Sequence, residues 1–198
     1  MPPTVPIYIH IPKTGGTSIL AALGQKRGLH VPVQDPGFQK RIRRVERAGA
    51  HPLLFTVFRN PVERMISVFH YYHSMDLSRP RTQENVLLAH IAQAYPSCNA
   101  FWENVDPPRL ANASVMFRAQ RWFFKKAKRP VTVIPFGDRL SERVKDRVGL
   151  EIPHLNRTNH GTSAEELAPS TIDRLRTWMA RDEAFWEKLT ANAATVTP

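Results

Sequence analysis

A glycine-containing turn near the start of the chain constrains the fold more than any other part of the sequence. The turn comprises residues 10–18 (HIPKTGGTS), and it overlaps the end of the apolar run 7–11. The apolar run predicts a strand, and the spacing of apolar residues in 17–23, just before Gly24, predicts a helix. A strand, a tight turn and a helix in this order are typical of the first step of an α/β fold.

Later segments extend this pattern. Residues 53–58 and 131–135 are short runs of β-forming residues, which predict two more strands. After the first of these runs, Asn60 is suited to cap a helix and Pro61 to occupy its first position. Further helices are predicted at 138–148, 169–180 and 182–189, and between 82 and 124. We therefore expect an α/β fold, a single P-loop-type domain with a mainly parallel central β-sheet flanked by helices.

Length and composition favour one soluble domain spanning residues 1–198. The chain has 198 residues, of which 42% are hydrophobic, which is enough for one core. It has no signal-like start and no apolar run of about eighteen residues, so we expect no membrane span. Cys98 is the single cysteine and has no disulfide partner in the chain, which is typical of a cytoplasmic protein.

The chain is strongly basic, with 28 Lys and Arg residues against 17 Asp and Glu and a formal net charge of +11. This excess predicts an anionic ligand. The basic residues are spread along the sequence, and neither zinc-finger spacing nor an RNA-recognition motif is present, so nucleic acid is disfavoured. An acidic polysaccharide or a multiply charged nucleotide fits the charge better.

The turn 10–18 has the residue types of a phosphate-binding loop. Free backbone N–H groups at a helix start attract anions, and Gly15 and Gly16 let the backbone approach the oxygens. Lys13 adds a positive charge, and hydroxyl donors are added by Thr14, Thr17 and Ser18. An ordinary strand-to-helix turn is the alternative.

The same turn differs from the Walker loop of nucleotide phosphotransferases. There the lysine follows the last glycine, whereas Lys13 precedes both glycines. A magnesium-dependent phosphotransferase also places a carboxylate at the end of a hydrophobic strand, but 53–58 leads into Arg59. These two differences disfavour a kinase.

Arg59 and Ser67 form a second predicted anion site. Arg59 follows the strand, and Ser67 lies two turns into the next helix. A guanidinium group and a hydroxyl group that converge can bind one more phosphate. Taken alone, each residue is equally well explained as a solvent-facing side chain, and the nearby phosphate-type turn is what favours binding.

Together the two motifs resemble those of sulfotransferases that use 3′-phosphoadenosine 5′-phosphosulfate (PAPS), particularly carbohydrate sulfotransferases and their short bacterial relatives. The 5′-phosphosulfate loop of that family looks like residues 11–18, and its 3′-phosphate motif looks like 57–61 with Arg64 and Ser67. Weaker similarity extends to 118–120, 136–140, 153–157 and 181–182. The animal enzymes carry a membrane anchor and disulfides that this chain lacks, so their acceptors are not transferred to it.

The resemblance implies transfer of a sulfuryl group from PAPS to a hydroxyl or amine, with release of 3′-phosphoadenosine 5′-phosphate (PAP) and no metal ion. The sequence does not identify the acceptor, for which an acidic molecule and a carbohydrate are both candidates. Lys13 would stabilise the leaving oxygen. The implied nucleotide contacts are Lys13, Thr14, Gly15, Gly16, Thr17, Ser18, Arg59, Ser67 and Arg157.

Sulfuryl transfer also needs a base that takes the acceptor proton, and histidine is the usual choice near neutral pH. His30 follows the first helix and His70 lies one turn beyond Ser67. We rank His30 first, because His70 would be drawn towards the 3′-phosphate. His51 and His73 are further candidates, and any one of the four is more often structural than catalytic.

Two other functions fit the same motifs. A P-loop small-molecule kinase would use ATP and magnesium, so binding of PAP against ATP, with and without magnesium, separates it from a sulfotransferase. A non-catalytic module would bind a nucleotide or polyanion without turnover. Turnover of labelled PAPS distinguishes a sulfotransferase from such a non-catalytic module.

Overall fold

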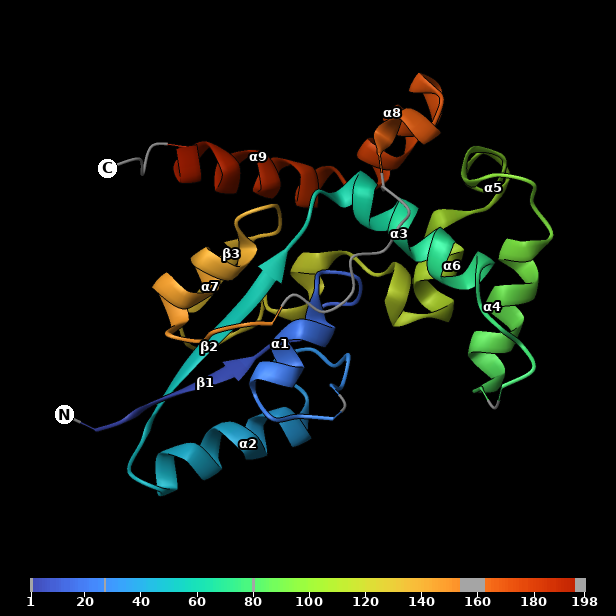
Figure 1. The fold of residues 1–198 in the computed structure, drawn as a ribbon. Coiled ribbons are helices and arrows are strands. Elements are labelled where there is room, and N and C mark those ends of the chain that lie inside the picture. Colours follow the sequence, from blue (N-terminus) through green and yellow to red (C-terminus); the bar gives the residue numbers. More distant parts are fainter. Residues whose placement is uncertain (1, 27, 80, 154–162, 195–198) are drawn as a thin grey trace. The chain divides into compact units, whose positions relative to one another are not determined.

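The computed structural model describes residues 2–26, 28–79, 81–153 and 163–194 (Figure 1). The chain divides into two compact units, which we describe one at a time. The first unit takes Met1–Arg59, Ala119–Thr158 and Trp186–Pro198, and the second takes Asn60–Arg118 and Asn159–Phe185.

The first unit contains a three-stranded sheet in the order β1-β2-β3, and both strand pairs are parallel. The strands are β1 (Thr4–Tyr8), β2 (His51–Phe58) and β3 (Val131–Pro135). The expected α/β fold with a parallel sheet is therefore confirmed. The boundaries predicted for the first strand were wrong, because the strand begins at Thr4 and ends at Tyr8. Ile9 and Ile11 are fully buried but follow the strand, although Ile9 N still donates to the backbone oxygen of Phe55 at 2.8 Å.

Helices cover both faces of this sheet (Figure 1). On one face, Phe38 and Ile42 of α2 (Pro36–Arg47) pack with Ile7 and Leu54. The opposite face carries Tyr8, Phe55, Val57 and Ile134, packed with Ile19 and Leu20 of α1 (Gly16–Ala22) and Val144 of α7 (Leu140–Val148). Neighbouring residues of a strand point to opposite faces, which explains why adjacent positions join different clusters.

Helix α2 is an element that the sequence reading did not predict. It begins at Pro36, and the Asp35 carboxylate Oδ1 accepts hydrogen bonds from the backbone N–H groups of Gly37 (2.8 Å) and Phe38 (3.2 Å). An Asp cap followed by proline is a standard helix start. The sequence thus contained the signal for this helix.

The second unit is helical in the part that the structure describes. Helix α3 (Pro61–His73) begins as predicted, since Asn60 Oδ1 accepts from Glu63 N at 3.1 Å. Short 3₁₀ turns are formed by Val115–Phe117 and Ala164–Glu166, and Gln120–Phe123 forms another in the first unit. The other helices are α4 (Gln83–Gln93), α5 (Cys98–Asn104), α6 (Pro107–Ala113), α8 (Pro169–Trp178) and α9 (Ala180–Ala194), which continues into the first unit.

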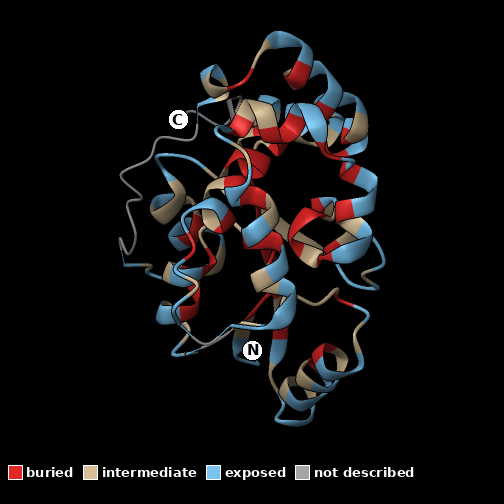
Figure 2. Cartoon of the chain, turned by 90° about the vertical axis from the view of Figure 1, so that its right-hand side faces the viewer, coloured by how far each residue is buried: buried red, intermediate tan, exposed pale blue. Residues whose placement is uncertain are grey.

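The core of the second unit is built around α3. The apolar side chains of Val62, Met65, Ile66 and Phe69 on this helix are buried. Figure 2 shows buried and exposed residues side by side along individual helices, as in amphipathic helices generally. Arg64 is also fully buried there. Its guanidinium group donates to the backbone oxygens of Met116 (2.7 Å) and Arg118 (3.0 Å). These bonds satisfy the buried charge within the unit.

The described residues also bear on the expectations about a membrane span and about Cys98. None of the helices they form has the length and apolar character needed to cross a bilayer. The Cys98 side chain is buried, and this burial raises the pKa of its thiol to about 12. The thiol therefore stays protonated near neutral pH.

Candidate anion-binding site

The turn 10–18 connects β1 to α1 at the carboxyl end of β1. Lys13 and Gly15 both have positive φ angles, 65° and 81°. A β-carbon at position 15 would also lie 3.2 Å from the Phe136 ring and 3.3 Å from Leu140. The positive φ angle favours glycine at position 15, and the close side chains of Phe136 and Leu140 add to this preference. Lys13 adopts a conformation that is uncommon for a residue with a side chain, which is frequent at functional sites.

The hydroxyl groups of the turn differ in their roles. Thr14 is fully buried, and its Oγ1 donates to the backbone oxygen of Ile11 at 2.9 Å. The Tyr8 hydroxyl lies 3.4 Å from the same Oγ1. Thr14 therefore holds the shape of the turn. Thr17 is exposed and Ser18 is half-buried, so these two residues are the more accessible donors.

Lys13 and Arg59 lie next to each other at the carboxyl ends of the first two strands. Arg59 follows β2, is only 8% exposed, and donates through Nη1 to the backbone oxygen of Lys13 at 3.4 Å. Its guanidinium carbon also lies 4.8 Å from the centre of the Phe136 ring. Burial, and secondly the charge of Arg59, lower the pKa of Lys13 to about 8. Two cations held together in this way attract an anion.

Gln120 fixes the backbone of Arg59. Its side-chain Oε1 accepts from Arg59 N at 2.9 Å, and its Nε2 donates to Arg59 O at 2.7 Å. Gln120 is completely buried. The residue belongs to the weakly similar segment 118–120, for which the sequence analysis predicts no role. Gln120 therefore positions the backbone of Arg59, a candidate anion-binding residue.

His10 and His30 form a ring pair beside the turn. Their ring centres are 4.2 Å apart in an edge-to-face arrangement. A β-carbon at position 16 would lie 2.0 Å from His10 Nε2, and one at position 28 would lie 2.4 Å from His10 Nδ1. The imidazole of His10 therefore fills the space that Gly16 and Gly28 leave, and it brings the segment carrying His30 against the turn.

Burial keeps His10 neutral. Desolvation, with a smaller contribution from His30, lowers the pKa of His10 to about 3. Its Nδ1 is buried, and no hydrogen-bond partner for this atom occurs among the described residues. A neutral ring can pack against the turn without adding a third positive charge beside Lys13 and Arg59. The sequence reading named His10 only as part of the turn and missed this contact.

The remaining predicted residues belong to other elements of the chain or lie outside the described residues. Ser67 and His70 are on α3 in the second unit, and His70 Nε2 lies 2.6 Å from Glu166 Oε2 of that same unit. His51 is the first residue of β2 and is exposed at the end of the sheet opposite the turn. The ring of His73 packs on Phe69 at 4.9 Å. Arg157 lies outside the described residues.

Comparison with other proteins adds no family assignment. No protein-family model, curated protein or solved structure matches this chain. In the described part of the chain, no three His, Cys, Asp or Glu side chains are grouped closely enough to hold a metal ion.

Proposed function

We propose that the protein is a PAPS-dependent sulfotransferase that transfers a sulfuryl group to a hydroxyl or amine acceptor and releases PAP. The observation that carries this proposal is the contact between Lys13 and Arg59, with the pKa of Lys13 lowered to about 8. A ligand with several negative charges offsets the repulsion between the two cations. PAPS carries a phosphosulfate and a further phosphate, so it has enough negative charge to bind both Lys13 and Arg59.

The residue types favour PAPS over ATP with magnesium. β2 leads directly into Arg59, a cation, where a magnesium-dependent phosphotransferase places a carboxylate. In this proposal, Lys13 stabilises charge on the oxygen that leaves the sulfur, and Arg59 binds a phosphate. Backbone N–H groups at Gly15 and Gly16 complete the cradle. Ser67 and Arg157 remain predicted ligands of the 3′-phosphate.

His30 is the proposed base that takes the acceptor proton. Its ring contacts His10, which packs on Gly16 of the turn. In this proposal His10 is a positioning residue, because it holds the segment of His30 without itself changing charge near neutral pH. His70 is the second candidate. Its hydrogen bond to Glu166, within the second unit, gives this histidine a structural role that needs no substrate.

Ligand binding followed by turnover tests the proposal. PAP should raise the melting temperature in EDTA as well as in magnesium, because a ligand that binds only the folded state stabilises it. Labelled PAPS should then transfer its sulfuryl group to an acceptor in a panel of glycans, phenols and lipids. A thermal shift seen only with ATP and magnesium would indicate a kinase, and PAP binding without any turnover would indicate a non-catalytic module.

The assignment of His30 has its own test. His30→Ala should lower turnover at saturating PAPS by roughly a hundredfold, the usual contribution of a general base, while PAP affinity stays within about twofold. His51→Ala and His73→Ala are matched controls in which turnover should change little. A His30 variant with near-normal turnover would reject this base and leave His70→Ala as the next variant to measure.

A further inference from the structure

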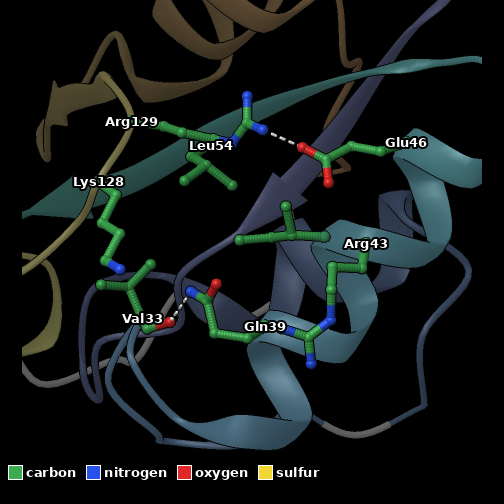
Figure 3. A pocket seen from close by; sticks show the side chains of 8 residues that line it. Val33, Gln39, Arg43, Glu46, Leu54, Lys128 and Arg129 are labelled. Carbon is green, nitrogen blue, oxygen red and sulfur yellow. Dashed lines mark hydrogen bonds and ion pairs between the residues drawn. The ribbon is translucent and has the colours of Figure 1, made fainter.

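A pocket of about 340 Å³ lies in the first unit, apart from the turn 10–18 (Figure 3). Helix α2 forms one wall, and the segment that precedes β3 forms another. None of the lining residues belongs to the turn or to the predicted nucleotide contacts and candidate bases. The lining consists of Val33, Gln39, Ile42, Arg43, Glu46, Leu54, Lys128 and Arg129.

The floor of the pocket is apolar. Val33, Ile42 and Leu54 contribute to it, and these side chains are 1%, 4% and 2% exposed. The three belong to the cluster that joins α2 to the sheet, so the floor is fixed by the packing of the unit. A fixed apolar floor favours a ligand with an apolar body.

The rim of the pocket is cationic. Arg43 and Lys128 are exposed at its edge, and Arg129 makes an ion pair with Glu46 across it (Figure 3). The rim therefore has three cations against one carboxylate. Gln39 Nε2 donates to the backbone oxygen of Val33 at 2.6 Å, which holds one further polar side chain in place. A charge excess of this kind selects for a negatively charged group on the ligand.

We propose that this pocket binds a small organic anion with an apolar body, such as an aryl sulfate or aryl sulfonate. The ring would lie over the small exposed parts of Val33, Ile42 and Leu54 and against the aliphatic stems of Arg43 and Lys128, whose charged ends would bind the anionic group. The volume is near the lower end of the range for small-molecule sites, which suits one fused ring system. The site does not depend on the proposed sulfotransferase activity, since the two share no residue.

Calorimetric titration with 2-naphthalenesulfonate tests the proposal, with 2-naphthol and inorganic sulfate as comparison ligands. The sulfonate should bind more tightly than either comparison ligand, because it alone combines a ring with a charge. Arg43→Glu and Lys128→Glu should each weaken its binding by about tenfold or more. The matched controls Arg44→Glu and Lys126→Glu make the same charge change at exposed positions outside the pocket, and they should alter binding by less than about twofold.

Glu46→Gln provides a test of opposite sign. Removal of this carboxylate frees Arg129 for the ligand and should tighten sulfonate binding by roughly threefold or more. Glu142→Gln is the matched control, since Glu142 pairs with Arg139 at an exposed position outside the pocket. Saturating PAP should leave sulfonate binding unchanged. Displacement by PAP, equal losses in the pocket and control variants, or no binding at all would each overturn the proposal.

Discussion

Arg59 and Arg64 are five positions apart and both are buried, yet their guanidinium groups have different surroundings. Arg64, in the second unit, donates to the backbone oxygens of Met116 and Arg118. Arg59, in the first unit, donates at 3.4 Å to one backbone oxygen, that of Lys13, but it also lies beside the charge of Lys13 and over the ring of Phe136. Carbonyl oxygens lower the energy of a buried cation, whereas a neighbouring cation raises it.

This comparison separates a structural arginine, Arg64, from the arginine that we propose binds a ligand, Arg59. Burial alone does not distinguish them, since Arg64 is the more buried of the two. The groups around each guanidinium distinguish them, since Arg64 is bound by carbonyl oxygens and Arg59 lies beside a second cation. The family resemblance placed both residues in one 3′-phosphate motif, but the backbone bonds of Arg64 account for it without a ligand.

Arg64→Ala should have the largest effect, and the effect should be on stability. The substitution removes a fully buried side chain and leaves two backbone oxygens without their donors, so we expect the free energy of unfolding to fall by about 3–5 kcal/mol. Urea denaturation followed by circular dichroism measures it. PAP affinity of the folded fraction should be unchanged. A loss below about 1 kcal/mol would contradict the structural role.

Arg59→Ala should act on binding instead. Loss of a charged hydrogen bond should weaken PAP by about 1.5–3 kcal/mol, roughly ten- to hundredfold by calorimetry. Stability should change by less than about 1 kcal/mol, because the repulsion with Lys13 disappears as well. Arg139→Ala, at an exposed ion pair in the same unit, is the matched control. Equal losses for PAP and for adenosine 5′-phosphate would show that Arg59 does not bind the 3′-phosphate.

Gln120→Ala should show a smaller effect that depends on Arg59. The variant removes two hydrogen bonds, one to the backbone N–H and one to the backbone C=O of Arg59, which should cost about 1–2 kcal/mol of stability and weaken PAP severalfold. In the double variant with Arg59→Ala, PAP affinity should fall no further than in Arg59→Ala alone. Gln93→Ala is a control, since Gln93 also donates to backbone oxygens, but in the second unit. Additive losses of PAP affinity would contradict a positioning role.

The smallest expected effect is on pH dependence. The pKa of Lys13 is lowered from 10.5 to about 8, so PAP affinity should fall as the pH rises through about 8 and Lys13 loses its charge. Stability without ligand should change in the opposite direction. Between about 8 and 10.5 the unfolded chain binds more protons at this site, so the contribution of Lys13 to stability rises with pH.

Titration of PAP at several pH values checks this prediction. Arg59→Ala should move the fall in affinity to higher pH, because the charge that helps to lower the pKa of Lys13 is removed. Lys13→Arg should abolish the fall near pH 8, since an arginine stays protonated there. A fall at the same pH in the Lys13→Arg variant would assign the titration to another group.

Local signals in the sequence predicted most of the fold. The strand Val131–Pro135 and the cap at Asn60 depend on neighbouring residues, and both predictions are confirmed. Asp35 and Pro36 carry the same type of signal as Asn60 and Pro61, but the apolar positions of α2 are few among its many basic residues, and the helix was missed. The apolar run 7–11 indicated burial correctly, whereas pairing with β2 decided where the strand ends.

The contacts that build the candidate site could not be predicted from local signals, because they join distant parts of the sequence. Gln120 is 61 positions from Arg59, and no spacing rule connects the two. The packing of His10 on Gly28 likewise depends on how the chain returns after α1. Residue types therefore identified Lys13 and Arg59 as candidates, while the residues that hold the site in place required the fold.

The fit of one imidazole between two glycines has a consequence for how this chain can vary. Positions 10, 16 and 28 share one volume, so the residue tolerated at one position depends on the residues at the other two. Alanine at position 16 is expected to be deleterious while His10 is present and acceptable once position 10 carries a small residue. The three positions are thus expected to show strong epistasis, and homologous sequences are expected to exchange them together rather than singly.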